Sequence, residues 1–191
     1  SVESQEENIP SVQEIPTDCR ELSEEEEIKK WIEEVLKKCS RFSMFTVFNS
    51  GDIYSSLPSV LSFAVKPFDV CYFKIPADIK RAKQLISLLK PVFEDPEKEF
   101  ISHDIKSDLI WLRRSGIYAR TKIFDTRIAH YLLQPDHSHE LERVALEILN
   151  YRLIKGSGEQ PAQLTLFFEN DQKMDHDLTE RTNVIFRLRD A

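Results

Sequence analysis

Three short apolar segments that follow one another closely constrain the fold of this chain more than any other feature. They read MFTVFN, VLSFAV and DVCYFKI, at 44–49, 60–65 and 69–75. Gly, Pro and Asp residues lie between them, and short runs rich in Val, Ile, Phe and Tyr with such borders are typical of β-strands. Three strands in succession with tight breaks predict an antiparallel meander.

Helical and strand patterns alternate after this meander. Strands are expected at 99–103 and 122–125, and helices at about 78–90, 105–115, 126–133, 138–150 and 171–189. Asp78 is predicted to cap the first of these helices, Gly116 to end the second and Pro135 to stop the third. A further helix at 24–39 precedes the meander, with Ser23 as its N-cap and Glu26 in the capping-box position. Such an order describes an α/β fold with a mixed sheet between helices.

The acidic residues of the chain are concentrated at its N-terminal end. The formal net charge is −7, and residues 1–40 hold 12 acidic and 5 basic side chains, which leaves 21 of each in the remainder. Residues 1–22 have the composition of an acidic linker or arm, and residues 23–191 are expected to form one domain. Because residues 41–191 are neutral overall, they lack the broad positive field that gives strong non-specific DNA binding.

Cysteine usage and hydropathy indicate a cytosolic protein. Cys19, Cys39 and Cys71 are widely spaced with no CxxC pair, which suits a reducing compartment better than a disulfide framework or a zinc site. No apolar run approaches the roughly 20 residues that cross a bilayer, so no membrane association is expected. The chain begins with Ser rather than Met, and we expect it to be a segment of a longer polypeptide.

Two long strings and the interval between them carry a resemblance to a known family. They are LLKPVFEDPEKEFISHDIKSDLIWLRRSGI at 88–117 and FDTRIAHYLLQPDHSHELERVAL at 124–146. The chain resembles, over about 42–188, the 3′–5′ exonuclease domain of family A (type I) DNA polymerases. That family has LKP-L-EDP, GHNLKYDLLVL and FDTMLASYLL-P strings in the same order. The resemblance implies a ribonuclease-H-like fold in a cytoplasmic, bacterial-type, nucleoid-associated polymerase of DNA replication and repair.

Active members of that family hydrolyse the 3′-terminal phosphodiester with two divalent metal ions, which need several converging carboxylates. The family's first motif, Asp-x-Glu on the first core strand, falls on Phe48 and Ser50, and a phenyl ring offers no ligand to a hard cation. Asp52 lies two residues further on, but it follows Gly51 in an expected turn, so we do not take it as a substitute.

The second and third motifs are kept only in part. Asn-x-x-x-Asp falls on Asp104 and Asp108. Asp108 is the only well-placed surviving ligand position, and its alternative interpretation is a solvated acid in the first turn of a helix. Asp104 could cap that helix. Tyr-x-x-x-Asp can be set against His176 and Glu180, where a His could act as a general base, although an ordinary surface pair is the interpretation we favour.

The histidines do not follow a zinc-binding spacing. His137 and His139 flank a loop after Pro135, and none of these residues, His130 included, is chosen as a ligand. His103 and His139 coincide with positions at which active relatives also carry His, so the resemblance implies scaffold roles for both.

These observations predict an exonuclease-like domain whose hydrolytic site has degenerated and which binds no metal or other cofactor. Its expected role is structural, beside a polymerase domain of the same chain, with DNA contacted weakly through the parent polymerase, and Phe48 would fill the space of the lost site. One alternative is an active nuclease with Mg or Mn bound by Asp52, Asp104, Asp108 and Glu180. The other is an interaction module in which residues 1–40 dock a basic partner.

Overall fold

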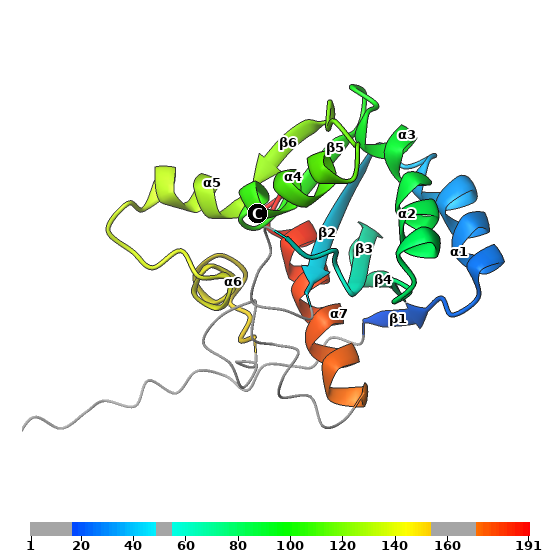
Figure 1. Cartoon of the computed structure of the whole chain (residues 1–191). Helices are drawn as coiled ribbons and strands as arrows, with labels where there is room; N and C mark the ends of the chain where they lie inside the picture. Colours follow the sequence, from blue (N-terminus) through cyan, green and yellow to red (C-terminus); the bar gives the residue numbers. More distant parts are fainter. Residues whose placement is uncertain (1–16, 49–54, 154–170) are drawn as a thin grey trace, which may run out of the picture.

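The computed structural model describes residues 17–48, 55–153 and 171–191, without the side chains of 171–175. Its centre is a six-stranded sheet in the order β1-β4-β3-β2-β5-β6 (Figure 1). The strands are β1 (Asp18–Glu21), β2 (Arg41–Val47), β3 (Val60–Lys66), β4 (Asp69–Lys74), β5 (Glu99–Ser102) and β6 (Lys122–Asp125). The predicted meander is present, since β2, β3 and β4 pair antiparallel. The other pairings, β1 with β4, β2 with β5 and β5 with β6, are parallel.

Helices cover both faces of this mixed sheet, as the sequence predicts. They are α1 (Glu25–Trp31), the π-helical turn η1 (Ile32–Leu36), α2 (Ile79–Ser87), α3 (Lys90–Phe93), α4 (Ile105–Arg114), α5 (Thr126–Leu133), α6 (Leu141–Leu149) and α7 (Asp171–Arg187). Residues of α1 to α4 share one hydrophobic core with one face of the sheet, and residues of α6 and α7 share a second core with the other. The architecture is that of a ribonuclease-H-like α/β domain.

The alternation of side chains along β2 divides the two cores. Phe42 and Met44 point into the first core, where Phe42 stacks on Phe100 with ring centroids 5.3 Å apart. On the opposite face, the Ser43 hydroxyl donates to the Thr182 carbonyl of α7 at 2.9 Å. Because successive side chains of a strand point to opposite faces, β2 is buried on both sides.

Helix ends confirm two of the sequence predictions. The Asp78 side chain caps α2 by accepting a hydrogen bond from the Arg81 backbone N–H at 2.9 Å. Gly116 follows α4 with φ +78°. Its N–H bonds to the Arg113 carbonyl and that of Ile117 to the Leu112 carbonyl, which is the Schellman pattern.

The prediction that residues 1–22 form a separate arm is wrong for its last part. Residues 1–16 lie outside the described part of the chain, but β1 joins the sheet edge beside β4. Leu22 is 2% exposed, and its N–H donates to the Tyr72 carbonyl at 2.9 Å. All four side chains of β1 are exposed. Composition missed this strand because it is held by backbone hydrogen bonds, which any residue except Pro can make.

The capping prediction at Ser23 is also wrong. Glu24 occupies the N-cap position in an extended conformation, and no side chain accepts a capping hydrogen bond there. The helix therefore begins at Glu25, one residue later than the capping box requires. Ile28 and Trp31 are nevertheless buried as predicted, which makes residues 25–36 part of the core and not of a detachable docking arm.

The structure also describes the three cysteines and the length and polarity of the helices. Cys19, Cys39 and Cys71 are all free thiols, respectively exposed, half-buried and buried, as their spacing predicts. Within the described ranges, every helix is too short or too polar to span a bilayer.

A buried ion triad fixes α6 against α7. The Arg181 Nε lies 3.0 and 2.9 Å from the two oxygens of Asp177, one turn earlier on α7. Its Nη2 donates to Glu142 of α6 at 2.7 Å. The side chains of Arg181 and Asp177 are each only 9% exposed, so water can do little to solvate either charge and each is neutralised mainly by its partner.

Replacing the cation of this triad is expected to destabilise the domain strongly. Arg181→Met leaves Asp177 as a buried, unpaired charge, which costs about 3–5 kcal/mol of unfolding free energy. Chemical denaturation measures it. The matched control is Arg81→Ala, which removes a pair with Glu25 from an arginine that is 62% exposed and should change stability by less than about 1 kcal/mol. Equal losses in both variants would contradict the role of the triad.

Candidate functional site

The candidate site lies where two parallel strands of the sheet end. Thr46 stands near the end of β2, Ser102 ends β5, and Asp108 belongs to the first turn of α4, which follows β5. The carboxyl ends of parallel strands form the usual position for binding sites in α/β folds. The sequence motif therefore located Asp108 at a position where function is common.

The Asp108 carboxylate is held entirely by neighbouring side chains. The Ser102 hydroxyl donates to Oδ2 at 2.5 Å and the Thr46 hydroxyl to Oδ1 at 3.0 Å. The indole Nε1 of Trp111 lies 3.4 Å from Oδ1. Asp108 is 7% exposed, so the interpretation of this residue as a solvated first-turn acid is wrong. Sequence position places the residue on the helix but does not reveal that the strand ends cover it.

Burial dominates the protonation of this carboxyl group. It raises the pKa of Asp108 to about 6, although the hydrogen bonds from Ser102, Thr46 and Trp111 favour the ionised form and oppose the shift. The group is therefore neutral in mildly acidic solution and charged at neutral pH.

A second aspartate organises the helix termini around this site. Asp125, at the end of β6, accepts from the Ile105 N–H of α4 at 2.8 Å and from the Arg127 and Ile128 N–H groups of α5 at 2.8 and 3.2 Å. In the sequence, Asp125 stands directly before the helix predicted at 126–133, and this position was the available signal that it caps α5. Its contact with α4 depends on the pairing of β5 with β6, which no local pattern reveals.

Asp104 stands at the N-cap position of α4 but does not cap it. The residue has a left-handed backbone, with φ 69°, and its side chain makes no capping hydrogen bond. The carboxylate instead lies 3.5 Å from Nη1 of Arg127, and the side chain is exposed. Asp125 takes the capping role because its carboxylate already lies at this helix terminus.

Of the positions that the sequence assigns to the first family motif and its neighbourhood, the structure describes only one. Phe48 is 5% exposed and belongs to the core beneath α1 to α4, which confirms that its ring is buried. Ser50 and Asp52 lie outside the described residues. The side chain that meets Asp108 is Thr46, two positions before Phe48 on the strand. If this contact is used to register the family's Asp-x-Glu pair, the pair falls on Thr46 and Phe48, and neither side chain has a carboxylate.

Glu180 is engaged elsewhere. Its Oε1 accepts from the Tyr151 hydroxyl at 2.6 Å, and its Oε2 lies 3.7 Å from Nδ1 of His176. His176 is exposed as expected for a surface pair, whereas the side chain of Glu180 is only 12% exposed. Helices α7 and α4 cover opposite faces of the sheet, and no hydrogen bond or ion pair between described residues joins Glu180 to Asp108.

The described carboxylates do not fit a pair of divalent ions at Asp108. Such ions need several carboxylates that converge on one point. In the part of the chain that the structure describes, the only group of three or more His, Cys, Asp or Glu side chains close enough to hold a metal consists of His130, His137 and Glu147. Asp108 is not part of it, and both of its oxygens already accept hydrogen bonds.

His103 connects β5 to α5 close to the candidate site. Its Nδ1 lies 2.7 Å from the Thr126 hydroxyl, and burial lowers its pKa to about 4. The ring is therefore neutral at physiological pH. These contacts agree with the scaffold role that the resemblance implies for this histidine.

Comparison with known proteins identifies the family. Residues 19–165 match the model of a DNA polymerase A family that is described as 3′–5′ exonuclease. This range covers most of the chain, which therefore belongs to the 3′–5′ exonuclease domain family of family A DNA polymerases.

Solved structures show the same fold in proteins of low sequence identity. The catalytic core of RRP6 from Trypanosoma brucei is 16% identical with a TM-score of 0.73, over 95% of this chain and 48% of that one. Brucella melitensis NrnC is 18% identical with a TM-score of 0.67, over 91% and 78%. The POL domain of Pol1 from M. smegmatis is 21% identical with a TM-score of 0.65, over 90% and 26%. The chain thus spans about half of the RRP6 core and about a quarter of the Pol1 chain.

The buried acid should give the stability of the domain a specific pH dependence. The pKa of Asp108 is about 6 in the folded state against 3.8 for the free group, so between these values the folded state holds more protons than the unfolded state. Asp108 therefore stabilises the folded state in acid, and this stabilisation is lost as the pH rises through about 6. Between about pH 4.5 and 7.5, we expect the unfolding free energy of wild type to fall by roughly 2 kcal/mol relative to that of Asp108→Asn. Urea unfolding at each pH measures this difference.

The matched control for this measurement is Asp104→Asn, which removes an exposed acid from the same helix end. It should retain most of the pH slope of wild type. An Asp108→Asn variant with the same slope as wild type would mean that Asp108 does not titrate near pH 6.

Proposed function

We propose that this domain serves as a structural platform in a family A DNA polymerase of DNA replication or repair and has no 3′–5′ hydrolytic activity of its own. The observation that carries the proposal is the environment of Asp108. Its two oxygens are satisfied by the hydroxyls of Ser102 and Thr46, and the next position on the same face of β2 is the buried ring of Phe48. The cytoplasm is the compartment we propose for such a polymerase.

The physical logic of this arrangement is the relief of charge repulsion. Several carboxylates that converge without metal ions repel one another strongly and raise each other's pKa. A hydroxyl and a phenyl ring remove those charges. Burial of a ring such as Phe48 contributes about 1.5–3 kcal/mol in addition. One remaining acid, held by donors, is then compatible with a stable core.

The exposed apolar side chains of α5 support contact with a polymerase domain of the same chain. Ile128, Tyr131, Leu132 and Leu133 are between 53% and 75% exposed. Exposed apolar side chains that gather on one element commonly mark an interaction surface. The fold also occurs within the longer Pol1 chain, of which this chain covers 26%.

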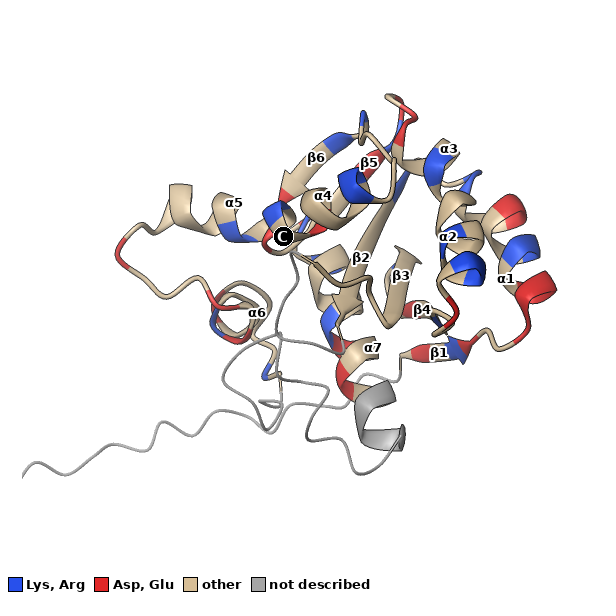
Figure 2. Ribbon diagram, viewed as in Figure 1, with Lys and Arg blue, Asp and Glu red and all other residues tan. Residues whose placement is uncertain are grey.

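The charge distribution supports only weak contact between this domain and DNA. Residues 41–191 carry 21 acidic and 21 basic side chains. In Figure 2, both acidic and basic residues lie on α1 and around α6. Since phosphate contacts supply most of the non-specific affinity for DNA, tight binding would have to come from the parent polymerase.

The nuclease assay tests this proposal directly. We expect no degradation of single-stranded DNA from its 3′ end above the buffer rate, in either magnesium or manganese, because the carboxylates needed to hold two ions are missing. Product lengths on a 5′-labelled oligonucleotide measure it. Asp108→Ala serves as the matched control and should give the same result as wild type.

The opposite outcome would be hydrolysis that requires the metal, stops with a chelator and is lost in Asp108→Ala. Such a result would favour an active site built from Asp108 with Asp52, Asp104 or Glu180. Hydrolysis that survives in Asp108→Ala would indicate a contaminating nuclease and leave the expected result for this domain in place.

A further inference from the structure

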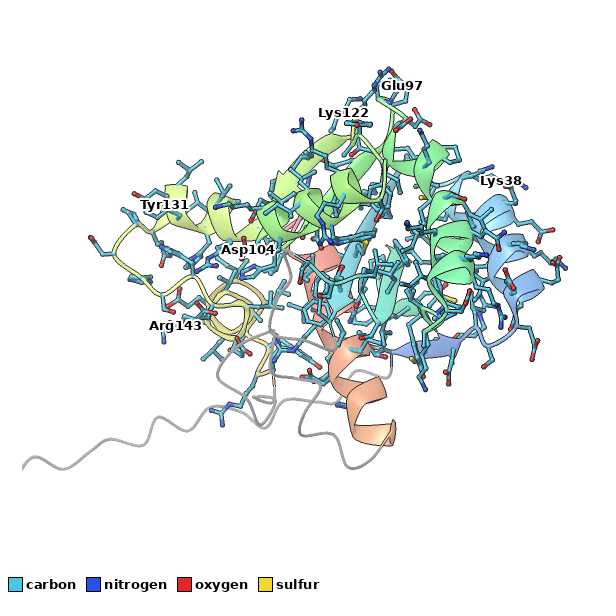
Figure 3. All side chains as sticks on the ribbon, viewed as in Figure 1. Lys38, Glu97, Asp104, Lys122, Tyr131 and Arg143 are labelled. Carbon is cyan, nitrogen blue, oxygen red and sulfur yellow. The ribbon has the colours of Figure 1, made fainter. Side chains whose placement is uncertain are left out.

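Helix α5 and the loop that follows it project from the body of the domain, and the chain then returns to α6, which packs beside α7 (Figure 1). Three side chains converge in this region: His130 from α5, His137 from the loop and Glu147 from α6. One ligand atom of each lies within 4.8 Å of the others. In Figure 3, the labels Tyr131 and Arg143 mark the α5 and α6 sides of this region.

We propose that His130, His137 and Glu147 bind a divalent transition-metal ion, with Zn²⁺ the ion that fits best. His130 Nε2 lies 3.0 Å from Glu147 Oε2, and His137 Nδ1 lies 3.2 Å from both carboxylate oxygens. Zinc binds imidazole nitrogen and carboxylate oxygen at about 2.0–2.1 Å, so neighbouring ligand atoms in a tetrahedral site lie roughly 3.3–3.5 Å apart. The distances from the two imidazole nitrogens to the carboxylate are therefore close to those of a zinc site, and the three ligand atoms, which lie within 4.8 Å of one another, have to close in on the ion.

The donor set determines which ion is expected. Imidazole suits zinc and other late transition metals, whereas magnesium and calcium prefer oxygen ligands alone. Two histidines and one carboxylate give zinc three protein ligands, and a water molecule completes the tetrahedron. This is a different chemistry from the two hard ions of active exonucleases, and it uses none of the residues around Asp108.

His139 contacts the ring nitrogen of His130 that does not face Glu147. His130 Nδ1 and His139 Nδ1 are 2.8 Å apart, so a single proton is shared between these two atoms. When that proton resides on His130 Nδ1 and is donated to His139, the Nε2 lone pair of His130 is free for a metal. Metal-bound histidines commonly donate their second ring N–H in this way. The side chain of His130 is 1% exposed, which keeps its ring in one orientation.

Arg143 is the group that competes with an ion in this site. Without metal, the Glu147 carboxylate is paired with His137, His130 and Arg143, and hydrogen bonding from His137 is the main cause that holds its pKa below the usual range. The Arg143 side chain is 52% exposed and lies one turn from Glu147 on the surface of α6. It can therefore turn into solvent when an ion neutralises the carboxylate.

The consequence of metal binding would be a fixed position for α5. The ion would join α5 to α6 through the loop, and α5 also carries the exposed apolar side chains of Tyr131, Leu132 and Leu133. A metal that binds the folded state stabilises it in proportion to its affinity and concentration. The site would thus be structural and would hold the exposed apolar surface in place.

The test is titration of the untagged, chelator-treated chain with Zn²⁺ by calorimetry, and with Co²⁺ by visible absorption. We expect one ion per chain, a tetrahedral cobalt spectrum and a higher melting temperature with zinc. His137→Ala and Glu147→Gln should each weaken binding at least tenfold. His139→Ala should weaken it by about 10–100-fold, because it removes the support of His130. His176→Ala, which removes another exposed histidine, is the control and should bind as wild type does.

His137 is exposed, so its replacement leaves no cavity, and circular dichroism establishes that each variant is folded. The proposal is overturned if folded wild type binds no stoichiometric zinc or if His137→Ala binds it equally well. It is also overturned if His176→Ala loses as much affinity as the ligand variants. Since none of these readouts measures nuclease activity, their outcome is independent of the function proposed for the domain.

Discussion

The burial of strand β2 on both faces is the constraint on which the rest of this structure depends. One face of β2 contributes Phe42 and Met44 to the core beneath α1 to α4, and the other lies against α7. A strand in this position must pair on both edges, here with β3 and β5, since buried backbone groups have to be satisfied. The same pairing with β5 brings Thr46 and Ser102 to opposite sides of the Asp108 carboxylate. Core and candidate site thus follow from one strand.

Most of the fold could be predicted from the sequence because its elements are locally encoded. The meander was visible in its apolar runs and turn residues, and the ends of α2 and α4 were visible in Asp78 and Gly116. Strand β1 was not visible, because its four side chains are exposed and it has no apolar pattern, while its pairing with β4 is made by backbone groups. The N-terminus of α1 was misplaced by one residue because Glu24, and not Ser23, occupies its N-cap position, where no side chain makes a capping hydrogen bond.

The candidate site was only partly predictable, since a motif fixes positions along the chain but not the environment of a side chain. The resemblance placed Asp108 at the start of a helix, where the structure has it, but not its burial against Ser102 and Thr46, which belong to two other elements. The cluster around Glu147 was even less predictable from the sequence. Its histidines follow no ligand spacing in the sequence, and they meet because a loop turns α6 back toward α5. Whether Phe48 and Ser50 are the family's metal positions stays a prediction, whereas the contact of Thr46 with Asp108 is observed.

The carboxylate of Asp125 has a consequence for how two helices of this domain are held. It accepts hydrogen bonds from the first turns of both α4 and α5, so the two helices share one anchor at the end of β6. Neither helix can shift away from the other without leaving backbone N–H groups unpaired. The helix that carries the buried Asp108 and the helix that carries the exposed Leu132 and Leu133 thus depend on the same carboxylate for the start of their backbones.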